Sequence, residues 1–144
     1  MKERSFQVRV PVDPRFLKAV RAFFQPLLEE EVGAEEAARL ILALDEACSN
    51  VVRHCCAERA KGDVAVQAVF GRNGLQFRVR DFCPASEVPR IRPRALDDVR
   101  PGGLGTHFIN EIMDRVAFEP EPERPDRVML VLEKARAGRQ GAGA

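Results

Sequence analysis

The longest helical pattern in the sequence is AEEAARLILALDEACSNVVRHCC, which spans residues 34–56. At about 100° per residue, its small and apolar side chains fall on one side of a helix. This apolar stripe consists of Ala37, Leu40, Leu44, Cys48, Val51 and Cys55. The opposite side carries Glu46 and Asn50, with Arg39, Ser49, Arg53 and His54 near them. The pattern therefore predicts a long amphipathic helix whose polar row either is simply solvated or has a function.

A hairpin pattern follows this helix. Apolar and polar residues alternate in DVAVQAVF (63–70) and in LQFRVRD (75–81), as in half-buried strands. The intervening GRNG (71–74) contains Asn-Gly, which favours a tight turn. Asp81 then shares a strand face with Leu75, Phe77 and Val79. An acid at the end of an apolar row lies either in water at the strand end or in a functional site.

The remaining segments complete the predicted order of elements. A strand at 6–12 contains Pro11, which favours a sheet edge, and a helix at 13–31 is capped by Asp13 and kinked or ended late by Pro26. The proline-rich stretch 82–101 is typical of a binding loop or lid. A helix at 104–115, strands at 116–121 and 127–134 and a flexible tail at 136–144 follow. This order indicates an α+β fold, a two-layer sandwich of helices on one face of a mostly antiparallel, mixed sheet.

Composition excludes several classes of function. The 144 residues are enough for one domain, and 23 Lys and Arg against 22 Asp and Glu give a net charge of +1. Nucleic-acid binders are usually strongly basic, and the chain has no Trp or Tyr on which bases could stack. It also lacks an apolar run that could span a membrane and an apolar signal segment at its N-terminus. We therefore expect a cytoplasmic protein without direct contacts to nucleic acid or membrane.

Four cysteines occupy positions 48, 55, 56 and 83. Their spacing does not match a zinc motif of the C-x2-C type, so we interpret them as small, reduced, buried side chains. Two alternatives stay open. One is a metal site built from His54, Cys55, Cys56 and Cys83, and the other is redox sensing.

Three features could act together on a phosphorylated ligand. Glu46 and Asn50 are four residues apart and face the same way on a helix. Asp81 ends an apolar strand, and the run Gly102-Gly103-Leu104-Gly105 precedes a helix. Glycines at a helix N-terminus let backbone N–H groups approach an anion. A carboxamide and a carboxylate near bound phosphates are oxygen ligands of the kind that Mg²⁺ takes.

These residues resemble the motifs of the GHKL, or Bergerat-fold, ATPases. DEACSNVVRH (45–54) looks like the N-box of the anti-sigma-factor serine kinases of the RsbW and SpoIIAB type, which reads E-x-x-x-N. DFCP (81–84) resembles the D-x-G-x adenine box, and PGGLGTHFINEIMD (101–114) resembles the glycine box that closes over the triphosphate. The final RVMLVLEK is similar to the family's last strand. The resemblance covers an ATPase domain at about residues 5–135, with the motifs in the family's order.

The resemblance implies a role for each matching residue. Asn50 would coordinate the Mg²⁺ bound to ATP, Glu46 would act as general base toward a hydroxyl, and Asp81 would accept a hydrogen bond from adenine. The phosphate-binding segment would comprise Gly102, Gly103, Leu104, Gly105 and Thr106. The implied function is a serine/threonine kinase and anti-sigma factor. It would phosphorylate a STAS-type antagonist, sequester a sigma factor, and form a homodimer through its first strand and helix.

The sequence departs from the family pattern in the adenine box and in the glycine box. Cys83 and Ala85 stand where the adenine box usually has glycines, and Thr106 and His107 stand where apolar residues are usual. An alternative hypothesis is therefore a regulatory module that binds nucleotide or partner with little or no catalysis. A third, a free-standing sensor histidine kinase, is disfavoured because no upstream helical segment with a phospho-accepting histidine is present. Within the predicted lid, Arg100 is a candidate contact to the γ-phosphate.

Overall fold

The computed structural model describes residues 2–57, 61–83 and 104–136, and for residues 56, 57 and 104–107 it describes the backbone only. The helices are the 3-10 turn η1 (Pro14–Phe16), α1 (Leu17–Val32), α2 (Ala34–Ala57) and α4 (Leu104–Ile112). The strands are β1 (Arg4–Pro11), β2 (Asp63–Phe70), β3 (Gly74–Asp81), β4 (Arg115–Pro120) and β5 (Val128–Ala135). The predicted loop beyond residue 83 and the predicted tail beyond residue 136 lie outside the described residues.

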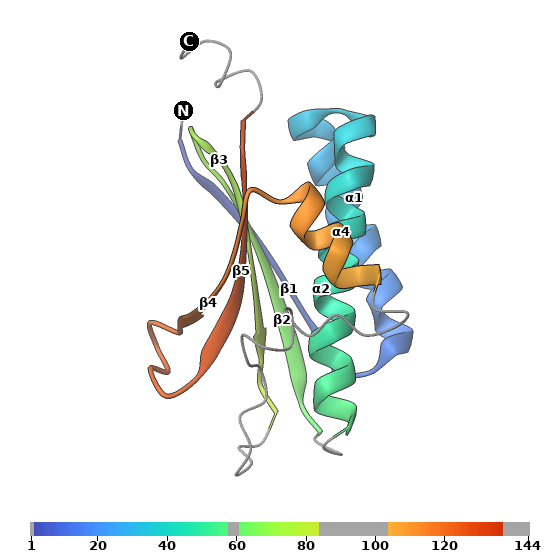
Figure 1. Cartoon of the computed structure of the whole chain (residues 1–144), viewed down its shortest axis with the longest axis vertical. Coiled ribbons are helices and arrows are strands. Elements are labelled where there is room, and N and C mark those ends of the chain that lie inside the picture. The colour runs from blue at the N-terminus through green and yellow to red at the C-terminus, as the bar shows by residue number, and fades with distance from the viewer. Residues whose placement is uncertain (1, 58–60, 84–103, 137–144) are drawn as a thin grey trace.

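The five strands form one sheet in the order β1-β2-β3-β5-β4. The four described pairings are antiparallel, and the helices α1, α2 and α4 lie together on one side of the sheet (Figure 1). The predicted two-layer α+β architecture is confirmed. β1 is an edge strand, as Pro11 predicts, because proline cannot donate to a second neighbour.

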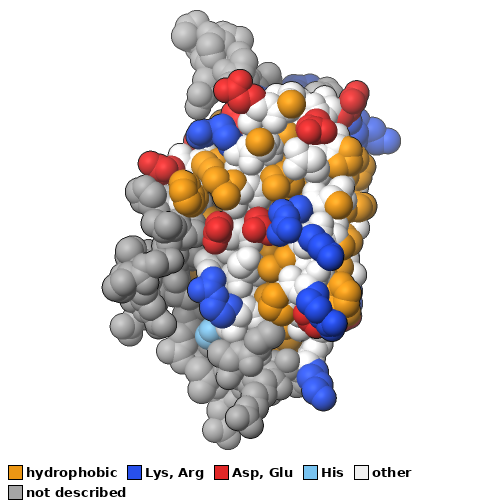
Figure 2. All heavy atoms as spheres, turned by 90° about the vertical axis from the view of Figure 1, so that its right-hand side faces the viewer, with side chains coloured by type: hydrophobic (Ala, Val, Ile, Leu, Met, Phe, Trp, Pro, Cys, Tyr) orange, Lys and Arg blue, Asp and Glu red, His pale blue; other side chains and the backbone are white. Residues whose placement is uncertain are grey.

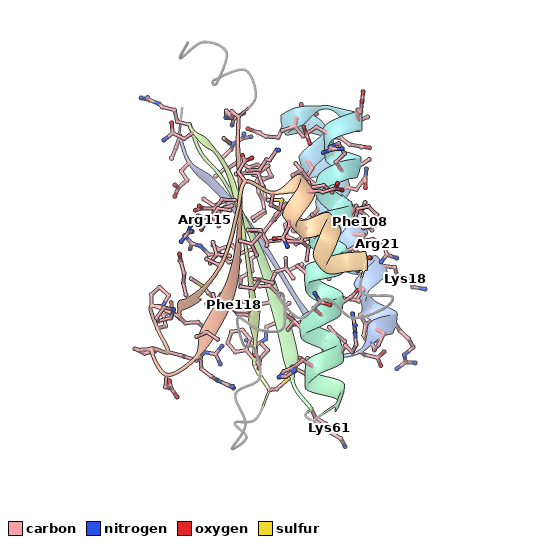
Figure 3. The ribbon with its side chains drawn as sticks, in the orientation of Figure 1. Lys18, Arg21, Lys61, Phe108, Arg115 and Phe118 are labelled. Carbon is pink, nitrogen blue, oxygen red and sulfur yellow. The ribbon has the colours of Figure 1, made fainter. Side chains whose placement is uncertain are left out.

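The core lies between the sheet and the helices. All six residues of the predicted apolar stripe of α2 are buried. Phe24 from α1 packs edge-on against Phe77 from β3, with ring centroids 6.2 Å apart. The inward rows of β2 and β3 meet this layer, and Figure 3 shows their side chains filling the space toward the helices. Burial of this kind is the main favourable term in folding, at about 25 cal/mol per Å² of apolar surface.

The first helix runs through Pro26 and ends close to its predicted bound. Together η1 and α1 cover residues 14–32, against the predicted 13–31, and α1 stops before Gly33, whose φ of +90° suits glycine. Pro26 is exposed, while Phe24 and Leu28 on either side of it are fully buried against the core. Packing of this helix face therefore outweighs the backbone hydrogen bond that proline removes. At the start of the segment, Asp13 accepts a hydrogen bond from the Arg15 amide (2.9 Å), which is the predicted cap.

An ion-pair cluster connects the last turn of α1 to the start of β1 and to the residue that follows β5. Glu31 pairs with Arg4 at the start of β1 and with Arg136 just after β5, the latter at 2.5 Å. Arg136 also donates to the carbonyl of Gly71 in the β2–β3 turn (3.1 Å). Burial alone would raise the pKa of Glu31, but the hydrogen bonds from Arg136 and Arg4 outweigh it and leave the pKa below its ordinary value. The ionised form of Glu31 is thus favoured in the folded protein.

Glu31→Gln is expected to lower the free energy of unfolding at pH 7 by about 1–2 kcal/mol, because the charge-assisted hydrogen bonds from Arg136 and Arg4 to a half-buried carboxylate are weakened. A carboxylate whose pKa is depressed on folding stabilises the protein above its unfolded-state pKa, and this stabilisation disappears as pH falls through the folded-state pKa. The difference between wild type and variant should therefore shrink below about pH 4. Urea unfolding at pH 7 and at low pH measures it. An equal difference at both pH values would contradict the assignment.

None of the helices in the described part of the chain has the length and apolar character required to cross a bilayer.

Candidate nucleotide-binding site

The polar row of α2 contains a carboxamide with an unused donor. Asn50 is half-buried, and its Oδ1 accepts a hydrogen bond from Nη2 of Arg53 (2.9 Å). Its Nδ2 is buried and finds no hydrogen-bond partner in the part of the chain that the structure describes. A buried N–H without a partner costs about 1–3 kcal/mol, so groups of this kind in folded proteins usually await a ligand, ion or water.

Glu46 lies one turn before Asn50 and is also half-buried. Its two candidate partners on the helix are engaged elsewhere, since Arg39 lies 3.6 Å from Oε1 of Glu36 and Arg53 donates to Asn50. Among residues 2–57, 61–83 and 104–136, no cation forms an ion pair with Glu46. Glu46 therefore does not serve in a surface salt bridge within this part of the chain, and such a salt bridge was the alternative to a functional role.

Asp81 ends β3 on the row that faces the core, and it is only 4% exposed. The acid that the sequence places at the end of an apolar row is therefore a buried carboxylate and does not lie in water at the strand end. Its Oδ1 accepts a hydrogen bond from the amide of Cys83 (3.2 Å) and lies 3.8 Å from Nη1 of Arg127. A buried carboxylate usually needs such partners, and it remains a strong acceptor for a ligand N–H.

Arginines from the turn between β4 and β5 hold the segment 81–83 in place. Nη2 of Arg124 donates to the Asp81 carbonyl (2.8 Å), and Arg127 donates to the Cys83 carbonyl. Arg124 is itself fixed by Glu121, which is 2% exposed, at 2.6 Å. Residues 121–126, between the predicted strands, have the composition of a plain turn, and the pattern does not predict these positioning residues. The only available signal was the dense alternation of acids and arginines in EPERPDR (121–127).

The ring of Phe82 is covered by guanidinium groups. The Cζ of Arg9 lies 3.9 Å from the ring centroid and that of Arg124 lies 4.2 Å from it. Arg9 also pairs with Asp63 at the start of β2 (2.9 Å). Cation–π contacts of this kind contribute about 0.5–2 kcal/mol each and fix the side chain that follows Asp81. The candidate adenine-binding segment is therefore rigidly supported from β1 and from the β4–β5 turn.

Gly62 lies directly against the backbone of the same segment. A Cβ at this position would lie 2.4 Å from the Phe82 carbonyl oxygen and 2.7 Å from the Cys83 Cα, distances at which the backbone must move. The Gly62 carbonyl also accepts a hydrogen bond from the Val12 amide (2.8 Å). Close backbone packing, which a single sequence does not reveal, explains why glycine is needed here.

Gly62→Ala is expected to displace residues 82–83 and to destabilise the fold by about 1–3 kcal/mol through overpacking. Any ligand that uses Asp81 should bind more weakly to this variant than to wild type. Thermal unfolding and nucleotide titration measure the two effects. Gly71→Ala is the matched control, because a Cβ there meets atoms only at 3.9 Å. Equal effects of the two substitutions would show that backbone crowding at Gly62 is unimportant.

The fold brings the end of α2 and the end of β3 together at one end of the molecule. The Cys55 sulfur near the end of α2 lies within 4.8 Å of the Asp81 carboxylate. Asn50 and Glu46 lie five and nine residues earlier, about 8 and 14 Å along the helix. In Figure 1 the second half of α2 and the end of β3 run toward the same lower end, and the exposed Lys61 marks that end in Figure 3.

The helix α4 packs against α2. It begins at Leu104, and its partly buried Phe108 packs against the core. Other predicted residues lie outside the described part: Gly102, Gly103, Ala85 and Arg100 entirely, and Leu104, Gly105, Thr106 and His107 in their side chains. The structure thus describes Glu46 and Asn50 on α2 and Asp81 at the end of β3, and it describes the predicted phosphate-binding segment only in the backbone where α4 begins.

In the part of the chain that the structure describes, helices cover one face of a five-stranded antiparallel sheet, and the second half of α2 and the end of β3 run toward the same end of it. The family model of the histidine kinase-like ATPase domain matches residues 10–133, and the chain belongs to this family. The resemblance seen in the three sequence motifs is therefore confirmed.

Two curated relatives give the more particular comparison. The serine-protein kinase RsbW of Bacillus velezensis (strain DSM 23117 / BGSC 10A6 / LMG 26770 / FZB42) is 24% identical over 122 residues, which cover 78% of this chain and 76% of the relative. The serine-protein kinase RsbW of Bacillus subtilis (strain 168) matches with the same identity and coverage. Within the family, the chain is thus similar to proteins that are named serine-protein kinases.

Proposed function

We propose that this protein is an ATP-dependent serine/threonine kinase and anti-sigma factor that phosphorylates a STAS-type antagonist protein and sequesters a sigma factor. The proposed ATPase domain extends over residues 5–135. The observation that carries the proposal is the buried Nδ2 of Asn50, which lacks a described partner one turn from a half-buried carboxylate. Family membership and the RsbW relatives support the reaction class.

The site residues fit magnesium-bound ATP. Asn50 offers a carboxamide oxygen for the cation, and for a phosphate oxygen it offers an N–H that has no partner among the described residues. Bound Mg²⁺ would supply charge neutralisation on the phosphates. In the ligand-free arrangement Arg53 donates to that same oxygen, so coordination by Asn50 requires the exposed Arg53 to turn away. The released guanidinium is then available to a phosphate group.

The other residues act through position and charge. Asp81 accepts a hydrogen bond from the exocyclic amine of adenine, and Arg124 and Arg127 keep the backbone around it in place. Gly102, Gly103, Leu104, Gly105 and Thr106 present backbone N–H groups to the phosphates at the start of α4. Glu46 accepts the proton of the attacking serine or threonine hydroxyl. Phosphoryl transfer needs mainly this positioning and charge stabilisation.

Asp81→Asn is expected to weaken ATP binding by about 10–100-fold, because the adenine amine then faces a group that can present N–H in place of a carboxylate oxygen. Calorimetric titration of ATP with Mg²⁺ measures this loss. Asp126→Asn, at an exposed position of the β4–β5 turn, is the matched control and should bind as wild type does. If the Asp81 variant binds ATP with unchanged affinity, the adenine assignment is wrong.

The reaction itself is tested by transfer from labelled ATP. The purified protein is mixed with a candidate STAS-domain antagonist and Mg²⁺, and the label on the antagonist is followed with time. Acid-stable label on a serine or threonine is expected. Failure to label any STAS-domain partner, in a preparation that binds ATP, would overturn the kinase assignment. Acid-labile label on a histidine would instead indicate a histidine kinase.

A second candidate function is a nucleotide-binding regulatory module without efficient catalysis. Cys83 favours it, because this side chain is buried beside Asp81 at a position where the family usually has glycine. Calorimetry with and without Mg²⁺ separates the two functions when combined with the transfer assay. Clear ATP binding together with unlabelled antagonist supports the module.

The proposed setting is a cytoplasmic homodimer that contacts its partners through protein surfaces. Figure 2 looks onto the helices, where apolar side chains are interspersed with charged ones. Phe16, Phe23 and Leu42 are exposed large hydrophobic residues, and the first two belong to η1 and α1. Exposed aromatic groups of this kind are common in protein–protein contacts. We place the dimer contact at the first strand and helix.

A further inference from the structure

Two cysteines and a carboxylate form a buried cluster between the end of α2 and the end of β3. The cluster consists of Cys55, Asp81 and Cys83, whose sulfur and carboxylate oxygen atoms all lie within 4.8 Å of one another. Their exposed fractions are 0%, 4% and 2%. Both cysteines are reduced. Neither sulfur has a part in the proposed kinase reaction.

The chemistry of these groups matches a thiophilic divalent cation. Zinc binds thiolate sulfur at about 2.3 Å and carboxylate oxygen at about 2.0–2.2 Å, so ligand atoms of a tetrahedral site are about 3.4–3.8 Å apart. Side-chain rotations that close the present separations by about 1 Å would suffice. Two sulfur ligands favour zinc over magnesium or calcium, which prefer oxygen. The fourth position would be left to water.

The charges around the cluster also balance. Two thiolates and one carboxylate carry three negative charges, the cation supplies two positive charges, and the Arg127 guanidinium 3.8 Å from Asp81 supplies the third. A buried neutral site is far less costly than a buried charged one. The amide of Cys83 donates a hydrogen bond to the Asp81 carboxylate and so fixes its orientation. Metal-binding carboxylates are commonly oriented by hydrogen bonds of this kind.

Cys48 is a buried cysteine that lies outside the cluster and can be compared with Cys55. It lies two turns before Cys55 on the same helix and is equally buried. Burial and the nearby Asp45 raise the pKa of its thiol far above the ordinary value, so it stays protonated and inert. It is not among the described residues whose donor atoms cluster. Cys48 is therefore a matched control for Cys55.

We infer that Cys55, Asp81 and Cys83 form a Zn²⁺ site and that zinc bound there competes with adenine for Asp81. The first half concerns the cluster alone. The second half rests on the proposed function, because it requires Asp81 to hold adenine. A site of this kind makes nucleotide binding sensitive to the concentration of a thiophilic metal.

The zinc site is tested on the reduced full chain without nucleotide. Titration with Zn²⁺ against a chromophoric chelator should give one tight site per chain, and Co²⁺ should give thiolate-to-metal charge-transfer absorption. Cys55→Ser and Cys83→Ser should each weaken binding by about 10–100-fold or more, the range seen even for outer-shell changes. Cys48→Ala should leave it unchanged. Absence of a tight site, or equal loss in the Cys48 variant, would overturn the inference.

Competition is tested by titrating ATP into zinc-loaded and zinc-free protein. Zinc loading should lower the apparent affinity of wild type for ATP and should leave that of Cys55→Ser unchanged. The variant also serves as the control for zinc that binds to the phosphates of ATP. Unchanged ATP affinity in zinc-loaded wild type would overturn the competition. Zinc binding in a protein that binds no ATP would instead refute the proposed function and leave the metal site standing. A Cys55–Cys83 disulfide after peroxide treatment, with no zinc affinity in the reduced chain, would overturn the metal assignment.

Discussion

Glu46→Gln is expected to lower the rate of phosphoryl transfer to a STAS-type antagonist by about 10²–10⁴-fold, the usual contribution of a general base. ATP binding should change by no more than about twofold, because Glu46 is proposed to act on the attacking hydroxyl and not on the nucleotide. Single-turnover transfer at saturating ATP measures the first effect, and calorimetry measures the second. The amide has nearly the shape of the carboxylate, so the substitution removes mainly the ability to accept a proton.

The surroundings of Glu46 allow its charge to be removed with little effect on the rest of the fold. Glu46 forms no ion pair with any of the described residues, and Arg39 and Arg53 are engaged with Glu36 and Asn50. Loss of its charge should therefore leave the stability of the fold nearly unchanged. Glu35→Gln, at an exposed position in the first turn of the same helix, is the control. Equal transfer rates for wild type and the Glu46 variant would remove Glu46 from the catalytic assignment and favour the regulatory module.

Much of this site is readable from the sequence because its residues lie on strongly periodic elements. The apolar stripe of α2 determines that Glu46 and Asn50 point away from the core centre, and the alternation of β3 places Asp81 on the inward row. Regular elements place side chains by spacing alone. The order of the motifs then leads to the ATPase family that the comparison confirms.

The features that the sequence does not reveal depend on contacts between distant segments. Arg124 and Arg127 act on residues 81–83 from more than forty positions away, and no local pattern indicates it. The tight approach of Gly62 to Cys83 is likewise a property of packed backbones. Pro26 is accommodated inside α1 because Phe24 and Leu28 pack in the core, and this packing offsets the local preference of proline against helix interiors. Such tertiary terms are invisible to a reading that sums local propensities.

The cysteines illustrate the same limit. Their spacing left a metal site with Cys55 and Cys83 as an alternative, and it suggested His54 and Cys56 as further ligands. Among the described side chains the cluster contains Asp81 and not His54, and the side chain of Cys56 lies outside the described part. Asp81 is remote in sequence from Cys55 but lies within 4.8 Å of it. The shared use of Asp81 by a cluster of thiols and by the proposed adenine contact follows only from three-dimensional proximity.

Asn50→Ala is expected to abolish the dependence of ATP binding on Mg²⁺ and to lower transfer by about 10²–10³-fold, because the metal's charge stabilisation is worth several kcal/mol. ATP titration with and without Mg²⁺ and single-turnover transfer measure these effects. Asn50→Asp retains an oxygen ligand and should recover part of the Mg²⁺ dependence. Asn110→Ala, at an exposed position of α4, should behave as wild type.

Stability distinguishes this role of Asn50 from a structural one. Its buried Nδ2 has no partner among the described residues, so the free protein bears the cost of an unsatisfied donor. Removing the carboxamide should therefore leave the unfolding free energy unchanged or raise it, even though it also removes the exposed contact with Arg53. Loss of activity together with retained stability is the pattern of a residue kept for a ligand and not for the fold. If Asn50→Ala lowered the free energy of unfolding by as many kcal/mol as it raised the barrier to phosphoryl transfer, Asn50 would instead be a residue that supports α2.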